Sequence, residues 1–277
     1  MNVRQPAVAG LFYPNSASEI LHFMESCQLA LAEQVELERK EVPRALILPH
    51  AGYVYSGYAA YQGVRLWQNH EQIKTVVIIG PAHRVAFEGV ATISSEAMAT
   101  PLGNCEVDSD LRTELIDEFD FISVSDFAHA QEHSLEVELP FIQKIIPDAK
   151  VLPLLNGRVS AQEVAQLVSY LWKREGVYFI ISSDLSHFHS YEIAKKIDQK
   201  TAEMIDVGDW QALNGERACG YLGIQGVLKY ISENLPGQNV NIERVALLNS
   251  GDTAGDKERV VGYGAWAIYE DGKGRVK

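Results

Sequence analysis

The chain has 277 residues, of which 47% are hydrophobic and 22% are charged, and its formal net charge at pH 7 is −13. This composition is ordinary for a globular protein with a sizeable core. The acidic balance argues against a nucleic-acid partner, because neutralising phosphates requires clusters of Lys and Arg that the sequence does not contain.

The cysteines and the apolar stretches indicate the compartment. Cys27, Cys105 and Cys219 lie far apart and form neither a CxxC pair nor a disulfide framework, which suits a reducing environment. No stretch approaches the roughly 18 apolar residues that a membrane span needs. The N-terminal stretch, interrupted by Pro6 and Pro14, lacks the apolar run of a signal peptide. We therefore expect a cytoplasmic protein with no membrane partner.

Buried strands alternate with amphipathic helices along the chain. The expected strands are 44–49, 75–80, 88–94, 150–155, 177–183, 244–250 and 260–269. The expected helices begin at the capping box of Ser16 and Glu19 and continue with 56–69, 111–119, 134–146, 160–176, 191–207 and 220–235. Pro140 either kinks its helix or marks a second start. The alternation predicts an α/β fold, with a central, mainly parallel sheet flanked by helices and residues 1–277 forming a single domain.

Histidines and aspartates follow several of these strands at the point where each strand ends. His50 follows the strand 44–49, His83 follows 75–80, Asp184 and His187 follow 177–183, and Asp252 follows 244–250. In open parallel sheets, ligands bind beyond the carboxyl ends of the strands, where the loops converge. If these strands are parallel neighbours, their polar side chains share one edge of the sheet.

This combination of side chains suits a metal centre. Two histidines and one carboxylate bind Zn or Fe(II) and leave coordination positions open for substrate and dioxygen. A further histidine serves as a general acid or base, because its pKa lies near neutrality. Simpler interpretations also exist: a lone histidine at a strand end is usually a hydrogen-bonded loop residue, Asp184 suits a helix cap, and Asp252 between glycines suits a tight turn.

Two other residues are weaker candidates for substrate binding. His133 lies in HAQEHSLEVE (128–137), which lacks the HExxH spacing that places two imidazoles on one helical face, so helix capping with some substrate contact is expected. Tyr53 follows a glycine in a loop. It either lines a pocket or only packs against neighbouring side chains. No phosphate-binding GxGxxG or GxxxxGK[ST] loop and no GxSxG nucleophile motif is present.

Eight motifs resemble those of the MEMO family and occur in order over nearly the whole chain. They are AGLFYP (9–14), LPHAGYVYSG (48–57), GPAHR (80–84), TPLG (100–103), EHSLEVELPF (132–141), SSDLSHF (182–188), CGYLGI (219–224) and SGDTAGD (250–256). The resemblance implies a fold similar to class III extradiol dioxygenases of the LigB type, with a metal site in a comparable position.

The resemblance also implies roles for individual residues. His50 and His83 match the two family histidines at the metal, while Asp184 and His187 match the aspartate and histidine near it. Animal members have a cysteine near the segment that is SGDTAG here, and the nearest acidic residue in this chain is Asp252, which makes it the candidate third ligand. Relatives encoded beside a radical-SAM protein and an AMMECR1-like protein imply a functional link to both.

The sequence therefore predicts a metal-dependent enzyme that performs oxidative chemistry on a small molecule. Fe(II) is the expected metal, with Zn or Cu as alternatives; His50, His83 and Asp252 bind it, and His187 is the acid/base, helped by Asp184. One alternative is a non-catalytic protein whose cleft captures a short peptide or an anionic metabolite. Another is a zinc-dependent hydrolase.

Overall fold

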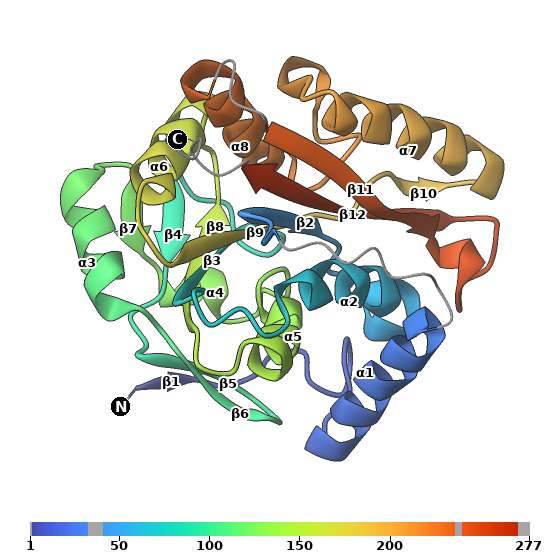
Figure 1. Ribbon diagram of the computed structural model, residues 1–277, viewed down its shortest axis with the longest axis horizontal. Helices are drawn as coiled ribbons and strands as arrows, with labels where there is room; N and C mark the ends of the chain where they lie inside the picture. The colour runs from blue at the N-terminus through green and yellow to red at the C-terminus, as the bar shows by residue number, and fades with distance from the viewer. Residues whose placement is uncertain (1, 33–40, 236–239, 271–277) are drawn as a thin grey trace, which may run out of the picture.

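The computed structural model describes residues 2–32, 41–235 and 240–270. Within them the main sheet has nine strands in the order β10-β12-β2-β9-β3-β8-β4-β7, with β11 paired to β12 (Figure 1). The strands of this sheet are β2 Ala45–Leu48, β3 Thr75–Pro81, β4 Val90–Thr92, β7 Ile122–Val124, β8 Lys150–Asn156, β9 Val177–Ser182, β10 His187–His189, β11 Val240–Asn249 and β12 Val260–Glu270. A smaller sheet pairs β1 Val3–Arg4, β5 Ala97–Thr100 and β6 Gly103–Glu106.

Four parallel strands form the centre of the main sheet. They run β2-β9-β3-β8, with Leu48 opposite Ser182 and Ile79 opposite both Leu154 and Ile181. These strands are rich in Val, Ile and Leu and are buried on both faces, as expected for parallel strands that are covered by helices on each side. The predicted α/β architecture with a mainly parallel sheet is therefore confirmed.

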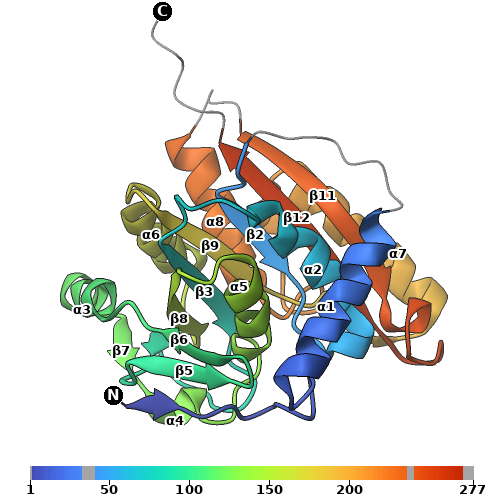
Figure 2. The same ribbon diagram turned by 60° about the horizontal axis from the view of Figure 1, so that its bottom comes forward.

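Helices cover both faces of the sheet (Figures 1 and 2). The helices are α1 Ala17–Ala32, α2 Tyr58–Val64, α3 Ser109–Glu118, α4 Asp126–His129, α5 Leu139–Ile145, α6 Ala161–Trp172, α7 Tyr191–Asp206 and α8 Tyr221–Asn234. Successive strand residues point to opposite faces, so Ile78 packs in the core beneath α1, α2 and α5, whereas Ile79 packs beneath α6, α7 and α8. No helix in the described part of the chain is long and apolar enough to cross a bilayer.

The outer strands differ from the simple parallel pattern. β12 is antiparallel to β2, and β11 is antiparallel to β12, so β12 separates β11 from the parallel core. β10 is a short strand that pairs with the beginning of β12, with His187 opposite Val261. The short strands β1, β5, β6, β7 and β10 were not predicted, because two to four residues carry too little periodicity to separate a strand from a loop.

The helix starts follow the predicted capping signals. The Ser160 side chain accepts a hydrogen bond from Glu163 N at 3.2 Å, and the Glu163 carboxylate accepts one from Ser160 N at 2.8 Å. Pro140 occupies the first turn of α5, which follows a 3₁₀ turn at Glu136–Glu138, so it marks a second helix start.

Ser160 and Ser190 allow a matched test of this capping, since each is an N-cap residue but only Ser160 caps through its side chain. We expect Ser160→Ala to lower the free energy of unfolding by about 1 kcal/mol. Ser190→Ala should change the free energy of unfolding by at most about 0.5 kcal/mol, which is typical of a surface substitution that removes no cap. Urea denaturation measures both. Equal losses in the two variants would contradict the assignment.

Candidate metal centre

Three histidines meet at the carboxyl edge of the parallel strands. His50 follows β2, His83 follows β3, and His133 lies in the loop between α4 and the turn at Glu136–Glu138. Each offers a ring nitrogen, and these three nitrogens lie within 4.8 Å of one another. The ring centroids are 5.2 Å apart for His50 and His83, 5.4 Å for His50 and His133, and 4.7 Å for His83 and His133. Such spacing matches a group of side chains that share one cation.

Hydrogen bonds select the nitrogen that His50 presents to this group. Its Nδ1 lies 2.7 Å from Ser182 Oγ, and this hydroxyl donates to the Ser134 carbonyl oxygen at 2.6 Å. Because the serine proton is used in that bond, Ser182 Oγ accepts from His50 Nδ1–H, and Nε2 keeps its lone pair. A metal-bound imidazole commonly donates its second nitrogen in this way.

The surroundings of His50 keep its ring neutral. The side chain is 1% exposed, and burial, assisted by the nearby His83 and His133, lowers the pKa of His50 well below its ordinary value. Glu138 Oε1 lies 3.3 Å from Ser182 Oγ, and burial raises the pKa of Glu138 well above its ordinary value, so this carboxyl is neutral as well. A neutral imidazole is the form that binds a metal ion.

The carboxylate of Glu132 orients the other two histidines. Its oxygens accept hydrogen bonds from His83 Nδ1 at 2.9 Å and from the backbone N–H groups of His83, His133 and Ser134. His133 Nδ1 lies 3.2 Å from Glu132 Oε1. Burial alone would raise the pKa of Glu132, but the hydrogen bonds from His133 and His83 outweigh it and hold the pKa well below its usual range. The Nε2 atom of His83 therefore remains available as a ligand, and the backbone N–H of His133 fixes that residue to the same carboxylate.

A glycine lets the histidine loop approach the end of β3. A Cβ atom at Gly80 would lie 2.7 Å from Leu135 Cδ2 and 3.0 Å from Ser134 Oγ, closer than packing tolerates. Ser134 Oγ also donates to the Pro81 carbonyl oxygen at 2.8 Å. Gly80 thus has a structural reason, because a larger residue at this position would require the side chains of Leu135 and Ser134 to shift.

Asp184 and Cys219 lie beside His50. Asp184 Oδ1 accepts from His50 N at 2.8 Å, and Oδ2 is 4.0 Å from His50 Nε2. Cys219 Sγ is 3.4 Å from the same Nε2 and accepts from Asp184 N at 3.3 Å. Burial raises the pKa of both Asp184 and the free Cys219 thiol above their ordinary values. The structure therefore brings the predicted Asp184 to the histidine group, together with a cysteine that the sequence analysis did not assign.

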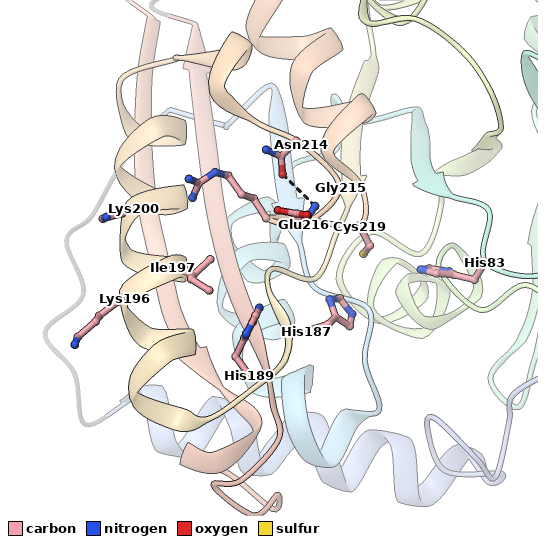
Figure 3. A pocket seen from close by; sticks show the side chains of 11 residues that line it. His83, His187, His189, Lys196, Ile197, Lys200, Asn214, Gly215, Glu216 and Cys219 are labelled. Atoms are coloured by element: carbon pink, nitrogen blue, oxygen red, sulfur yellow. Dashed lines mark hydrogen bonds between the residues drawn. The ribbon is translucent and has the colours of Figure 1, made fainter.

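His187 lies in the wall of a cavity of about 740 Å³ that His83 and Cys219 also line (Figure 3). Its Nδ1 lies 2.8 Å from the Leu185 carbonyl oxygen, which only accepts, so Nδ1 carries the proton and Nε2 is unprotonated in the neutral ring. This backbone carbonyl, and not the Asp184 carboxylate, makes the hydrogen bond that orients the ring. The assignment of His187 as acid/base, helped by Asp184, stays a prediction.

Asp252 is not part of the histidine group. One carboxylate oxygen accepts from Asn249 N at 2.9 Å, which completes the capping box of the 3₁₀ turn Ser250–Asp252 after β11, and the other accepts from the Tyr191 hydroxyl at 2.5 Å. The physical reason is the strand order, since β12 lies between β11 and β2. Among the described residues, His133 completes the group of three potential ligands where the sequence analysis expected Asp252.

The structure decides between the alternatives for Tyr53 and gives His133 a position that was not expected. Tyr53 is 3% exposed, stacks on Phe141 with 4.6 Å between ring centroids, and donates its hydroxyl to the Val137 carbonyl oxygen. It packs in the core and supports the segment that follows His133, instead of lining the cavity. His133, expected to cap a helix and touch substrate, faces two other imidazoles. The sequence did not reveal this position of His133, because it depends on Glu132, whose role as an orienting carboxylate cannot be read from sequence spacing.

Comparison with known proteins places the chain in a family. Residues 4–267 match the family model described as Memo-like protein. The chain belongs to this family. Among its relatives, MEMO1 family proteins from Methanosarcina mazei, Nitrosopumilus maritimus and Aquifex aeolicus are 37%, 33% and 33% identical. Each alignment covers 95–96% of this chain and 98% of the relative.

A solved structure supports the fold of this Memo-like chain. It is that of an uncharacterised protein from Escherichia coli K12, with a TM-score of 0.53 and 14% sequence identity. The match covers 80% of this chain and 98% of that protein. At this level of identity the likeness concerns the fold alone.

The Ser182 hydroxyl gives a test of the histidine group with a control at the next position. Ser182→Ala removes the partner of His50 Nδ1, and we expect Zn(II) affinity to fall about 10- to 100-fold. Ser183, which is equally buried, bonds to Asp184 O and Gly220 N and does not touch His50, so Ser183→Ala should retain the affinity. Competition with a chromophoric chelator measures both. An unchanged affinity in Ser182→Ala would refute the proposed orientation.

A second prediction concerns His129, which is 2% exposed and donates from Nε2 to Ala91 O. Burial lowers its pKa from 6.5 to about 4, so between these pH values the unfolded chain binds a proton that the folded chain does not. The stability that His129 contributes is therefore present above pH 6.5 and is lost as the pH falls toward 4.

We expect His129→Gln to lose less stability than the unmodified protein over this pH range, because glutamine can donate to Ala91 O without binding a proton. Urea denaturation at several pH values measures the difference. His22→Gln, at an exposed position on α1, serves as the control and should follow the unmodified protein. Parallel curves for His129→Gln and the unmodified protein would contradict the prediction.

Proposed function

We propose that this Memo-like protein is a metal-dependent enzyme whose centre is held by His50, His83 and His133. The observation that carries the proposal is the group of three imidazole nitrogens within 4.8 Å. The second nitrogens of His50 and His83 are already engaged by Ser182 and Glu132, so each ring is oriented before any ion arrives.

Three protein ligands leave coordination positions open for substrate, dioxygen or water. The cavity of about 740 Å³ borders this centre and supplies the space that a substrate needs. We propose Fe(II) as the native metal and oxidation of a small molecule as the reaction. The support for iron is that the sequence motifs resemble the MEMO family, whose fold is similar to that of class III extradiol dioxygenases.

His187 is proposed as the group that moves a proton to or from the substrate. Its Nδ1–H is committed to Leu185 O, so the exchange takes place at Nε2. His187→Gln should therefore retain the metal while losing turnover. Loss of the metal from His187→Gln would assign this residue to the metal centre instead.

A zinc-dependent hydrolase is the second candidate, and the donor set favours it. Three histidines with an open fourth position form a known set for catalytic zinc, and zinc lowers the pKa of bound water enough to make a nucleophile. The imidazole ligands alone suit Fe, Zn and Cu. The identity of the metal therefore decides between the two kinds of chemistry.

The deciding experiment is metal analysis of untagged protein purified without oxygen. We expect near-stoichiometric iron in the unmodified protein and its loss in the double variant His50→Ala/His83→Ala. The control is His22→Ala/His70→Ala, which removes two histidines that belong to neither the histidine group nor the cavity. Equal metal loss in both double variants would reject the site.

Each metal leads to a different activity assay. Iron that depends on His50 and His83 justifies measuring oxygen uptake with catechols and thiols. Zinc that depends on them favours hydrolysis. If neither protein contains metal and neither takes up added Fe(II), the enzyme proposal fails, and a binding protein that uses the same cleft becomes the better account.

A further inference from the structure

The cavity beside the histidine group has one wall made by charged side chains. The charged residues of its lining are Lys196, Lys200, Glu216 and Arg217. Three of these residues are cationic, one is acidic, and the whole chain carries a net charge of −13. An excess of positive charge around a cavity in so acidic a protein is the charge pattern that attracts an anionic ligand.

These cations are not used to neutralise the protein's own carboxylates. Within the described ranges, no carboxylate makes an ion pair with Lys196, Lys200 or Arg217. Lys196 and Lys200 are exposed on α7, one helical turn apart, and therefore lie on the same side of the helix. Glu216 is exposed and lies at the same cavity.

Arg217 is the most fixed of the three cations. It is half-buried, and its Nη1 donates to Thr201 Oγ1 at 3.4 Å, which ties the guanidinium to α7. Its backbone N–H donates to Asn214 O at 3.1 Å, within the segment that also carries Gly215 and Glu216. One guanidinium hydrogen bond to protein leaves its other donors for a ligand, and this planar group binds carboxylate and phosphate oxygens in pairs.

The cavity has two chemically different ends. Figure 3 shows His83 and Cys219 on one side, His187 between, and α7 on the other side, where Lys196 and Lys200 extend away from His187. A ligand that spans the cavity would therefore place one end near the histidine group and the other near the cations. The volume of about 740 Å³ lies within the range of about 300–1,000 Å³ that is usual for small-molecule sites.

We propose that the substrate is a small organic acid or phosphate ester, whose anionic group is bound by Arg217, with Lys200 and Lys196 adding positive charge to the same wall of the cavity. This assignment rests on the proposed function, because the remainder of the substrate would extend toward the histidine group and react there. Anion binding itself needs no metal. The two proposals can therefore fail separately.

Three related probes test the anionic requirement: benzoate, phenyl phosphate and the uncharged benzyl alcohol. Their dissociation constants are measured by ligand-observed NMR on the full chain. We expect at least one anion to bind about tenfold or more tightly than benzyl alcohol. Tighter binding of benzoate identifies the site as a carboxylate site, and tighter binding of phenyl phosphate identifies it as a phosphate site.

Matched variants locate the binding. Arg217→Gln and Lys200→Gln should each lower the affinity for the preferred anion, and the loss for Arg217→Gln should be about tenfold. Lys200 is exposed, so its substitution should leave the fold intact even if that of Arg217 does not. The control is Lys195→Gln, which removes the same charge from the same helix but does not line the cavity. Glu216→Gln should strengthen binding by removing a negative charge.

Four results would overturn this inference. They are equal affinity for benzyl alcohol and the anions, no anion binding at millimolar concentrations, equal weakening in Lys195→Gln and Lys200→Gln, and loss of anion binding in His50→Ala/His83→Ala. The last result would mean that the anion binds to the metal. Retained anion binding in a protein that takes up no metal would instead refute the enzyme proposal while preserving the cationic site.

Discussion

A single buried carboxylate organises the group of three histidines. Glu132 is 2% exposed, and an anion in such a position is stable only when hydrogen-bond donors replace the water that it has lost. The chain supplies backbone N–H groups from both sides, from His83 at the end of β3 and from His133 and Ser134 in the loop. The two histidines are thus held near each other as a result of satisfying one charge. Without that charge the loop would lose its hydrogen bonds to His83 at the end of β3.

The N-terminal segment holds the same loop from its other side. Arg4 donates to the carbonyl oxygens of His129 and Glu132 and forms a buried ion pair with Glu136 at 2.7 Å. Glu136 in turn accepts from the backbone N–H groups of residues 7 and 8 and from the Tyr13 hydroxyl. Segments that are more than 120 residues apart in sequence therefore share one polar network. The position of His133 therefore depends on this long-range network as well as on its own neighbours.

These networks explain which parts of the site could be predicted. The rule that functional groups follow parallel strands correctly located His50, His83 and Asp184 at one edge, because the strand pattern is local and strong. It failed for His133, which follows no strand and is placed by Glu132, and for Asp252, which follows a strand on the far side of β12. Sequence periodicity predicts strands but not their order in a sheet. Cys219 was missed for a similar reason, since only the folded chain places it beside His50.

If the three histidines hold a metal ion as proposed, their distribution along the chain would link metal supply to the survival of the protein. They belong to three separate segments, so the unfolded chain offers no comparable site, and an ion that binds only the folded form stabilises it by mass action. At a free metal concentration of 100 times the dissociation constant, the folded form is stabilised by about 2.7 kcal/mol. A cell short of that metal would therefore hold molecules that open more often and are degraded sooner. The abundance of the protein would then follow the metal content of the cell without any dedicated regulator.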